Sequence, residues 1–210
     1  MSTTSGAGRT RILRAARGLF LDRGFADVSM QQIADDAAIT KATLYHHFRD
    51  KEDLFVEVVR REHERIGQEL EALIAGATAL EEQLRRIAVT FFEGGEGDFG
   101  RLTEDLYRHV SEERYVSLYD ELHRDASSPE GVIRACFVWA MESGEIAPLN
   151  PDLLATLFFS MLHGLRWVSD YTPSSPTFTH HDAALLPHLL LHGIATKPGM
   201  QNARLDTDPT

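Results

Sequence analysis

The chain has 210 residues, of which 43% are hydrophobic, and a formal net charge of −11. This length is sufficient for one small and one larger domain with a buried core. A strongly acidic total argues against a polyanion as partner, but the charge is unevenly distributed. Residues 1–60 hold nine Lys or Arg against eight Asp or Glu, whereas the other 150 residues hold twelve against twenty-four. Because local charge governs phosphate binding, the composition does not exclude nucleic acid as a partner of the first 60 residues.

A basic helix is predicted near the N-terminal end, and Gly24 provides its C-terminal stop. Its apolar positions repeat at helical spacing: Ile12, Ala16, Leu19 and Phe20. Its basic residues are Arg9, Arg11, Arg14 and Arg17. The polar residues that precede it, 1–8, are predicted to form a disordered tail.

Two short capped helices joined by a tight turn are predicted between Ser29 and Phe48. Ser29 is a good N-cap, and Gln32 three positions later completes a capping box. The pattern recurs at once, because Thr40 is the N-cap of a second helix only a few residues after the first ends near Ala37. Two helix starts this close together require a bend, which is the arrangement of a helix-turn-helix.

The second of these helices has an inward face, with Leu44 and Phe48, and an outward face of small, hydroxyl-bearing and cationic side chains. Such an outward face suits the major groove of DNA, because small residues allow close approach and polar tips reach bases and phosphates. The alternative is the solvated face of an ordinary helical hairpin. The residues expected to contact DNA are Ser29, Met30, Gln31, Thr40, Lys41, Ala42, Thr43, Tyr45, His46 and Lys51. Among them, those expected nearest to bases are Lys41, Ala42 and His46, and those expected mostly on phosphates are Thr40, Thr43, Tyr45 and Lys51.

A long helix is predicted to begin at Asp50, where Asp50 and Asp53 form an N-cap and a further capping box. Beyond Leu73 the sequence predicts more helices, at about 79–92, 99–110, 115–124, from 129 to Gly144, and from 151 onward. The alternating pattern of a strand does not occur over a useful length. The sequence therefore predicts an all-α protein.

The order of these features resembles the TetR family of bacterial transcriptional regulators, without a gap from about Arg9 to Val59. The residues that fit the family's pattern are Ile33-Ala34, Thr43-Leu44-Tyr45, His47-Phe48, Lys51-Glu52 and Leu54. The family usually has Gly where Ala38 and Ala42 stand in this chain. If the turn residue has a positive φ, Ala38 carries a strain of about 1 kcal/mol.

The resemblance implies a three-helix DNA-binding domain at 9–69, with its helix-turn-helix at 29–48, joined by the long helix to a helical effector-binding and dimerisation domain at 70–196. It also implies a small-molecule pocket between the middle helices. The predicted lining residues are Phe91, Phe92, Tyr107, His109, Tyr115, Phe137, Met141, His163 and Trp167. Ordinary core packing is the alternative for most of these side chains.

The last two helices, at about 151–170 and 181–195, carry apolar faces that are too wide for one packing partner. They predict burial against a second copy of the chain, as in the four-helix dimer bundle of the family that the chain resembles. A twofold pair of helix-turn-helix units also reads two DNA half-sites about one helical turn apart. The alternative is that both helices lie inside a monomeric core.

Cys136 is the single cysteine, and its apolar neighbours predict a buried structural thiol. No secretion signal is visible, and the longest apolar segment, 153–165, is too short to span a bilayer. We therefore expect no membrane partner and a location in the bacterial cytosol or nucleoid. The polar stretch 197–210 is predicted to be a disordered tail.

Ten histidines raise the question of a metal ion. His188 and His192 are spaced i,i+4 on one helix, and His180 and His181 lie nearby. No carboxylate or cysteine completes a ligand set locally. The sequence therefore predicts surface or interface histidines, with no metal ion or cofactor.

The patterns, together with what the resemblance implies, predict a homodimeric repressor that binds a palindromic operator in double-stranded DNA and is released by a small-molecule effector. An enzyme is not expected, because no nucleophile–base set or complete ligand spacing is visible. Two alternatives remain. One is an effector-independent DNA-binding regulator or activator, and the other is a His-rich helical metal or haem protein or enzyme.

Overall fold

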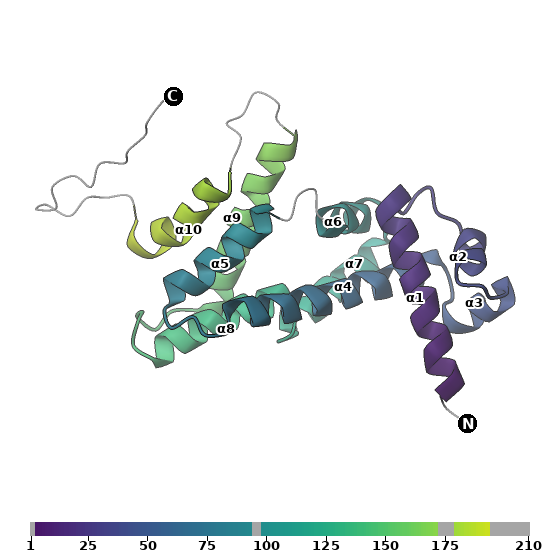
Figure 1. Cartoon of the computed structure of the whole chain (residues 1–210), viewed down its shortest axis with the longest axis horizontal. Helices are drawn as coiled ribbons and strands as arrows, with labels where there is room; N and C mark the ends of the chain where they lie inside the picture. Colours follow the sequence, from purple (N-terminus) through teal and green to yellow (C-terminus); the bar gives the residue numbers. More distant parts are fainter. Residues whose placement is uncertain (1–2, 94–97, 172–178, 194–210) are drawn as a thin grey trace, which may run out of the picture.

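The computed structural model describes residues 3–93, 98–171 and 179–193, and these residues form ten α-helices and no strand (Figure 1). The predicted all-α fold is confirmed. In chain order the helices are α1 (Thr3–Arg23), α2 (Met30–Asp36), α3 (Lys41–His47), α4 (Lys51–Ile74), α5 (Leu80–Glu93), α6 (Asp98–His109), α7 (Glu112–Arg124), α8 (Pro129–Glu142), α9 (Pro151–Tyr171) and α10 (His180–His192).

The molecule is elongated, and α4 connects its two ends (Figure 1). Helices α1 to α3 and the start of α4 form one end, which we call the head. Farther along, α4 packs against α8, which in turn packs against α9, while α10 packs mainly against α5. No helix within the described ranges has the length and apolar character needed to cross a membrane.

The helix starts follow from local hydrogen bonds that the sequence predicts. The Ser29 hydroxyl accepts from Gln32 N at 3.2 Å, and Gln32 Oε1 accepts from Ser29 N at 2.7 Å, which completes the capping box of α2. Thr40 caps α3 through Thr43 N, at 3.1 Å. Asp50 caps α4 through Asp53 N, at 2.8 Å.

The predicted reciprocal bond of the α4 capping box is wrong. The Asp53 carboxylate accepts from Arg49 N, at 3.1 Å, one residue before the N-cap. The start of α4 is therefore capped from one side only.

Helix α1 begins at Thr3, so the predicted disorder of residues 1–8 is wrong for residues 3–8. This extension passes close to α3, because a Cβ built on Gly8 would lie 3.7 Å from His47 Nε2. His47 therefore lies beside the first helix. Residues 1–2 and the predicted tail at 197–210 lie outside the described residues.

Two hydrophobic clusters form the core. The first holds the head together and includes Leu102 and Leu106 of α6 and Leu118 and Leu122 of α7. The second joins α5, α8, α9 and α10. Packing therefore divides the chain differently from the boundary predicted at residue 69, because α6 and α7 follow that boundary in sequence but bury their apolar sides against the head.

Ala38, in the turn between α2 and α3, has φ +52°, in the left-handed region. We expect Ala38→Gly to raise the free energy of unfolding by about 0.5–1 kcal/mol, because glycine removes the strain and this gain exceeds its entropic cost. The matched control is Ala37→Gly, at φ −73°, where glycine relieves no strain and only destabilises, through its entropic cost and the loss of a buried methyl group. Urea denaturation of both variants is the measurement, and equal destabilisation would show that the turn is unstrained.

Candidate nucleic-acid interface

Helix α3 presents a short polar face at the outer end of the head. Leu44 is fully buried and Phe48 is 3% exposed, so these two side chains fix the helix against the core. The side chains on the opposite face are all exposed: Lys41, Ala42, Thr43, Tyr45 and His46. The structure therefore brings together, on one accessible surface, the residues predicted to enter the major groove.

Contacts within the head hold several of these side chains in place. The Thr40 and Thr43 hydroxyl oxygens lie 2.8 Å apart, and the Lys41 ammonium lies 5.9 Å from the centre of the Tyr45 ring. Gln31, on α2, donates to the Asp35 carboxylate at 2.8 Å. These contacts partly order the face, which reduces the conformational entropy that binding to a partner must remove.

Met30 does not belong to this face. It is only 7% exposed and lies in the hydrophobic cluster of the head. As the first residue of α2, it points its apolar side chain inward, and the predicted DNA contact is replaced by core packing.

Lys51 also has a different place from the one predicted. Its ammonium donates to the carbonyl oxygens of Phe25 at 2.8 Å, Val28 at 2.9 Å and Ala26 at 3.4 Å, and lies 4.2 Å from the centre of the Phe25 ring. Burial lowers the pKa of Lys51, although the nearby negative charges of Asp27 and Asp105 act to raise it. Since three carbonyls occupy its three N–H donors, Lys51 fastens the α1–α2 turn in this structure.

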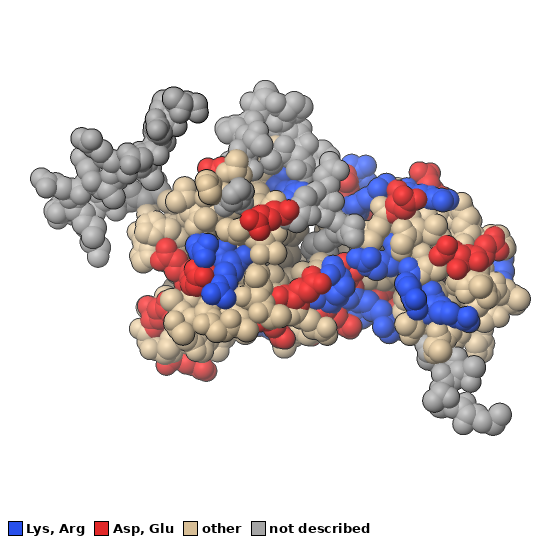
Figure 2. All heavy atoms as spheres, viewed as in Figure 1, with Lys and Arg blue, Asp and Glu red and all other residues tan. Residues whose placement is uncertain are grey.

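The first four arginines of α1 differ in whether they bind a carboxylate of α4. Arg9 binds Glu57 of α4 at 2.8 Å, and Arg17 binds Glu62 of α4 at 2.7 Å. Arg11 and Arg14 are exposed. Figure 2 shows Lys and Arg side chains along α1. The surface of the head therefore carries positive charge beside α3 although the chain as a whole is acidic.

Helices α6 and α7 bind the head through the α1–α2 turn and the start of α4. Asp105 of α6 accepts from Phe25 N at 2.7 Å, in the α1–α2 turn. Arg114 of α7 binds both carboxylate oxygens of Asp50, at 2.7 and 2.8 Å. Hydrogen bonds from Arg114 lower the pKa of Asp50 to about 2. A movement of α6 or α7 would therefore be transmitted directly to the start of α4 and to the turn before α2.

The residues predicted to line one effector pocket lie in two separate places. Tyr107, His109 and Tyr115 lie at the head, where Tyr107 is 76% exposed and His109 stacks on Phe25 at 5.6 Å. The residues that lie in or against the second hydrophobic cluster are Phe91, Phe92, Phe137, Met141 and His163. The side chain of Trp167 is outside the described part of the structure. Helical spacing predicted that these residues point inward, but it could not distinguish between two cores.

Two histidines lie near each other beside the second cluster, His63 buried and His163 half-buried. His163 of α9 packs against the rings of Phe159 at 4.3 Å and Phe91 at 5.0 Å. His63 of α4 is 7% exposed. Burial lowers the pKa of each histidine to about 4, and the proximity of His163 lowers that of His63 further, so both are neutral at pH 7. The sequence did not reveal His63, because its neighbours in the chain are all charged.

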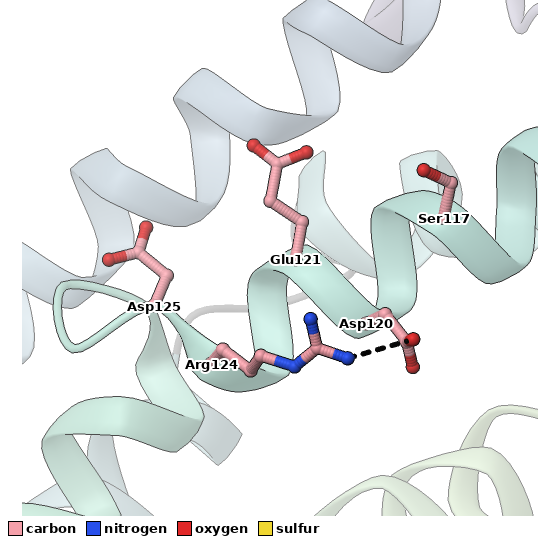
Figure 3. A pocket seen from close by; sticks show the side chains of 5 residues that line it. All are labelled: Ser117, Asp120, Glu121, Arg124 and Asp125. Atoms are coloured by element: carbon pink, nitrogen blue, oxygen red, sulfur yellow. Dashed lines mark hydrogen bonds and ion pairs between the residues drawn. The ribbon is translucent and has the colours of Figure 1, made fainter.

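A polar groove of about 570 Å³ lies beside α7 (Figure 3). Its lining residues are Ser117, Asp120, Glu121, Arg124 and Asp125. Glu121 points toward α4, where it accepts from Arg60 at 2.7 and 2.9 Å. None of the predicted pocket residues lines this groove, and its charged walls differ from the apolar pocket that was expected.

The capped α2–α3 pair and the exposed face of α3 define a DNA-binding protein of the helix-turn-helix class. Residues 12–58 match the family model described as bacterial regulatory proteins, tetR family. The chain is 26% identical over 206 residues to the HTH-type transcriptional repressor KstR2 of Mycolicibacterium smegmatis. The aligned region covers 93% of this chain and 94% of the relative. Residues 12–58 therefore form a DNA-binding domain of the TetR type, and the chain as a whole is similar to named transcriptional repressors.

The fold is also that of solved regulators. A TetR-family transcriptional regulator from Pectobacterium atrosepticum has a TM-score of 0.68 at 22% identity, covering 94% of this chain and 99% of that one. The regulator FadR from Bacillus subtilis, solved in complex with stearoyl-CoA, has a TM-score of 0.65 at 19% identity, covering 89% and 99%. At these identities the likeness concerns the fold.

Proposed function

We propose that the chain acts in the bacterial cytosol as a homodimeric repressor, which binds a palindromic operator and leaves it when a small-molecule effector binds. The observation that carries this proposal is the exposed polar face of α3, held at the outer end of the head by Leu44 and Phe48. No catalytic role is assigned to the chain.

On DNA, α3 enters the major groove with its N-terminal end first. Lys41, Ala42 and His46 lie nearest the base edges, and Thr40, Thr43 and Tyr45 hold phosphates. Ser29 and Gln31, both exposed at the start of α2, reach the neighbouring backbone. The revised set omits Met30, which is buried, and Lys51, which is held by the α1–α2 turn.

The dimer forms through α9 and α10. Leu153 and Leu157 of α9 are 56% and 45% exposed, and Leu185 and Leu189 of α10 are 48% and 40% exposed. Each pair is spaced i,i+4, so each helix presents one apolar stripe to solvent. Burying a leucine contributes about 1.5–3 kcal/mol, which supports pairing of these stripes with a second copy.

The effector binds beside His63 and His163, between α4, α5 and α9. Neutral imidazoles among phenylalanines combine an apolar surface with a few polar groups, which is typical of small-molecule sites. Binding there favours a different position of α4 relative to the head, and only a difference in affinity between the two positions produces release. Because FadR was solved with stearoyl-CoA, long-chain acyl-CoA is the first probe.

One observation favours a second candidate, an effector-independent regulator. The predicted pocket residues do not form one site, and the groove beside α7 is polar. A thermal-shift series with acyl-CoA and other small carboxylates distinguishes the two candidates. A ligand that raises the melting temperature and weakens DNA binding supports the effector-released repressor.

Selection of binding sites from random duplexes tests the proposed function as a whole. The full chain, at low salt, is expected to enrich an inverted repeat with half-sites about one helical turn apart. A single unpaired half-site would contradict the dimer. Failure to enrich any sequence would contradict DNA reading by α3.

Two variants separate phosphate contacts from base reading. Tyr45→Phe removes one hydroxyl and is expected to weaken binding to all selected duplexes alike, by about fivefold. Lys41→Ala is expected to change the preferred base at one position, because a base contact contributes about 1–3 kcal/mol of discrimination. Binding isotherms on a panel of single-base variants measure both effects. Tyr119→Phe, on the exposed surface of α7, is the matched control, and an unchanged preference in Lys41→Ala would overturn its role.

A further inference from the structure

The contact between α5 and α10 brings a carboxylate onto the pair of histidines spaced i,i+4. Glu81 Oε1 lies 3.1 Å from His188 Nδ1, and Glu81 Oε2 lies 2.9 Å from His192 Nε2. The two imidazole rings are 4.7 Å apart at their centres, on the same side of α10. Two histidines and one carboxylate, from helices far apart in sequence, thus converge at one point on the surface.

Their spacing fits a metal ion. One ligand atom from each of the three residues lies within 4.8 Å of the others. In a tetrahedral zinc site with bonds of about 2.0–2.1 Å, neighbouring ligand atoms are about 3.3 Å apart. The nitrogen–oxygen distances of 2.9 and 3.1 Å run to the two different carboxylate oxygens and are those of hydrogen bonds, so the side chains must rotate before one ion meets both imidazoles and the carboxylate.

We propose that Glu81, His188 and His192 bind a divalent transition-metal ion, with Zn²⁺ as the best fit. Two imidazole nitrogens and a carboxylate oxygen are donors that zinc accepts, whereas Mg²⁺ and Ca²⁺ require mostly oxygen ligands. The side chains are 41–56% exposed, so water fills the remaining coordination positions.

A bound ion fastens α10 to α5. The exposed face of α10 that carries His188 and His192 also carries Leu185 and Leu189, so the ion orders the helix that the proposed dimer uses. The metal site goes beyond the proposed function and does not depend on it. The sequence did not reveal the site, because the carboxylate lies 107 residues before His188 and 111 before His192.

The test uses the full chain without a histidine tag, freed of metal with a chelator that is then removed. Zn²⁺ is titrated in competition with a chromophoric chelator, and Co²⁺ is titrated in parallel as a spectroscopic probe. The expected result is one ion per chain, visible Co²⁺ bands of a low-symmetry site with nitrogen and oxygen ligands, and a higher melting temperature with Zn²⁺. If the competition titration shows no site that binds one Zn²⁺ per chain more tightly than the chelator, the proposal is overturned.

The variants His188→Ala, His192→Ala and Glu81→Gln are each expected to weaken zinc binding by about 100-fold or more, since even the loss of an outer contact costs 10–100-fold. His181→Ala, on the same helix, is the matched control and is expected to bind zinc as the unaltered chain does. Melting curves in chelator show whether each variant is folded. If the double variant His188→Ala/His192→Ala still binds one Zn²⁺ per chain tightly, the ion binds elsewhere and the assignment is wrong.

Discussion

Replacing Gly67 with alanine is expected to lower the free energy of unfolding by about 3 kcal/mol, the upper part of the range for an overpacked core. Gly67 lies in α4 where the helix meets the corner between α7 and α8. A Cβ at this position would lie 1.8 Å from the Ser127 carbonyl oxygen and 2.8 Å from its carbon. Both atoms belong to the backbone, so the corner must move away from α4.

The matched control is Gly18→Ala, the same substitution in α1. A Cβ there meets nothing within 4 Å, so the variant should gain about 0.5–1 kcal/mol from the higher helix propensity of alanine. Urea denaturation of the two variants gives changes of opposite sign if the close approach is present. Equal stabilisation of both variants would show that α4 and the corner are farther apart.

The second large effect concerns Glu62 of α4, a buried carboxylate that joins the head to the long helix. Glu62 is 2% exposed and accepts from Arg17 at 2.7 and 3.0 Å and from Arg65 at 3.0 Å. Burial alone would raise the pKa of Glu62, but hydrogen bonds from the two arginines outweigh it and lower the pKa to about 2. The unfolded chain has the ordinary value of 4.5.

Because the pKa is lower in the folded state, the ionised carboxylate stabilises the fold above pH 4.5, and this contribution is lost as the pH falls from 4.5 toward 2. Both arginines are partly exposed, so water replaces part of any lost contact. We expect Glu62→Gln to lower the free energy of unfolding by about 2 kcal/mol at pH 7, and to make the loss of stability in acid shallower.

Urea unfolding of Glu62→Gln between pH 3 and pH 7 measures both effects. Glu69→Gln removes a 63% exposed carboxylate that also pairs with Arg65, and should change stability by less than about 0.5 kcal/mol. If Glu62→Gln and the unaltered chain lose stability in parallel as the pH falls, Glu62 does not carry the assigned charge network.

The features best predicted from the sequence are those that depend on contacts between residues close together in the chain. The caps at Ser29, Thr40 and Asp50 depend on side chains that reach backbone groups three residues away, and all three are present. The positive φ of Ala38, one of the four residues between α2 and α3, fulfils the condition under which the sequence indicated strain in the turn. Local chemistry was sufficient to place the exposed face of α3.

Contacts between distant segments were not predictable in the same way. Lys51 reaches carbonyls 23–26 residues earlier in the chain, and no local pattern indicates that its charge is used there. Tyr107 and His163 both lie on amphipathic helices, yet they belong to opposite ends of the molecule. Glu81 joins His188 and His192 only through the packing of α10 on α5.

The central claim is that two α3 helices of a dimer read two half-sites together. Its most direct test measures binding isotherms of the full chain, at one fixed salt concentration, on the selected duplex and on the same duplex with one half-site scrambled. Since each mismatched base pair typically costs about 1–3 kcal/mol, scrambling one half-site is expected to weaken binding by about 100-fold or more. Equal affinity for the two duplexes would contradict the claim.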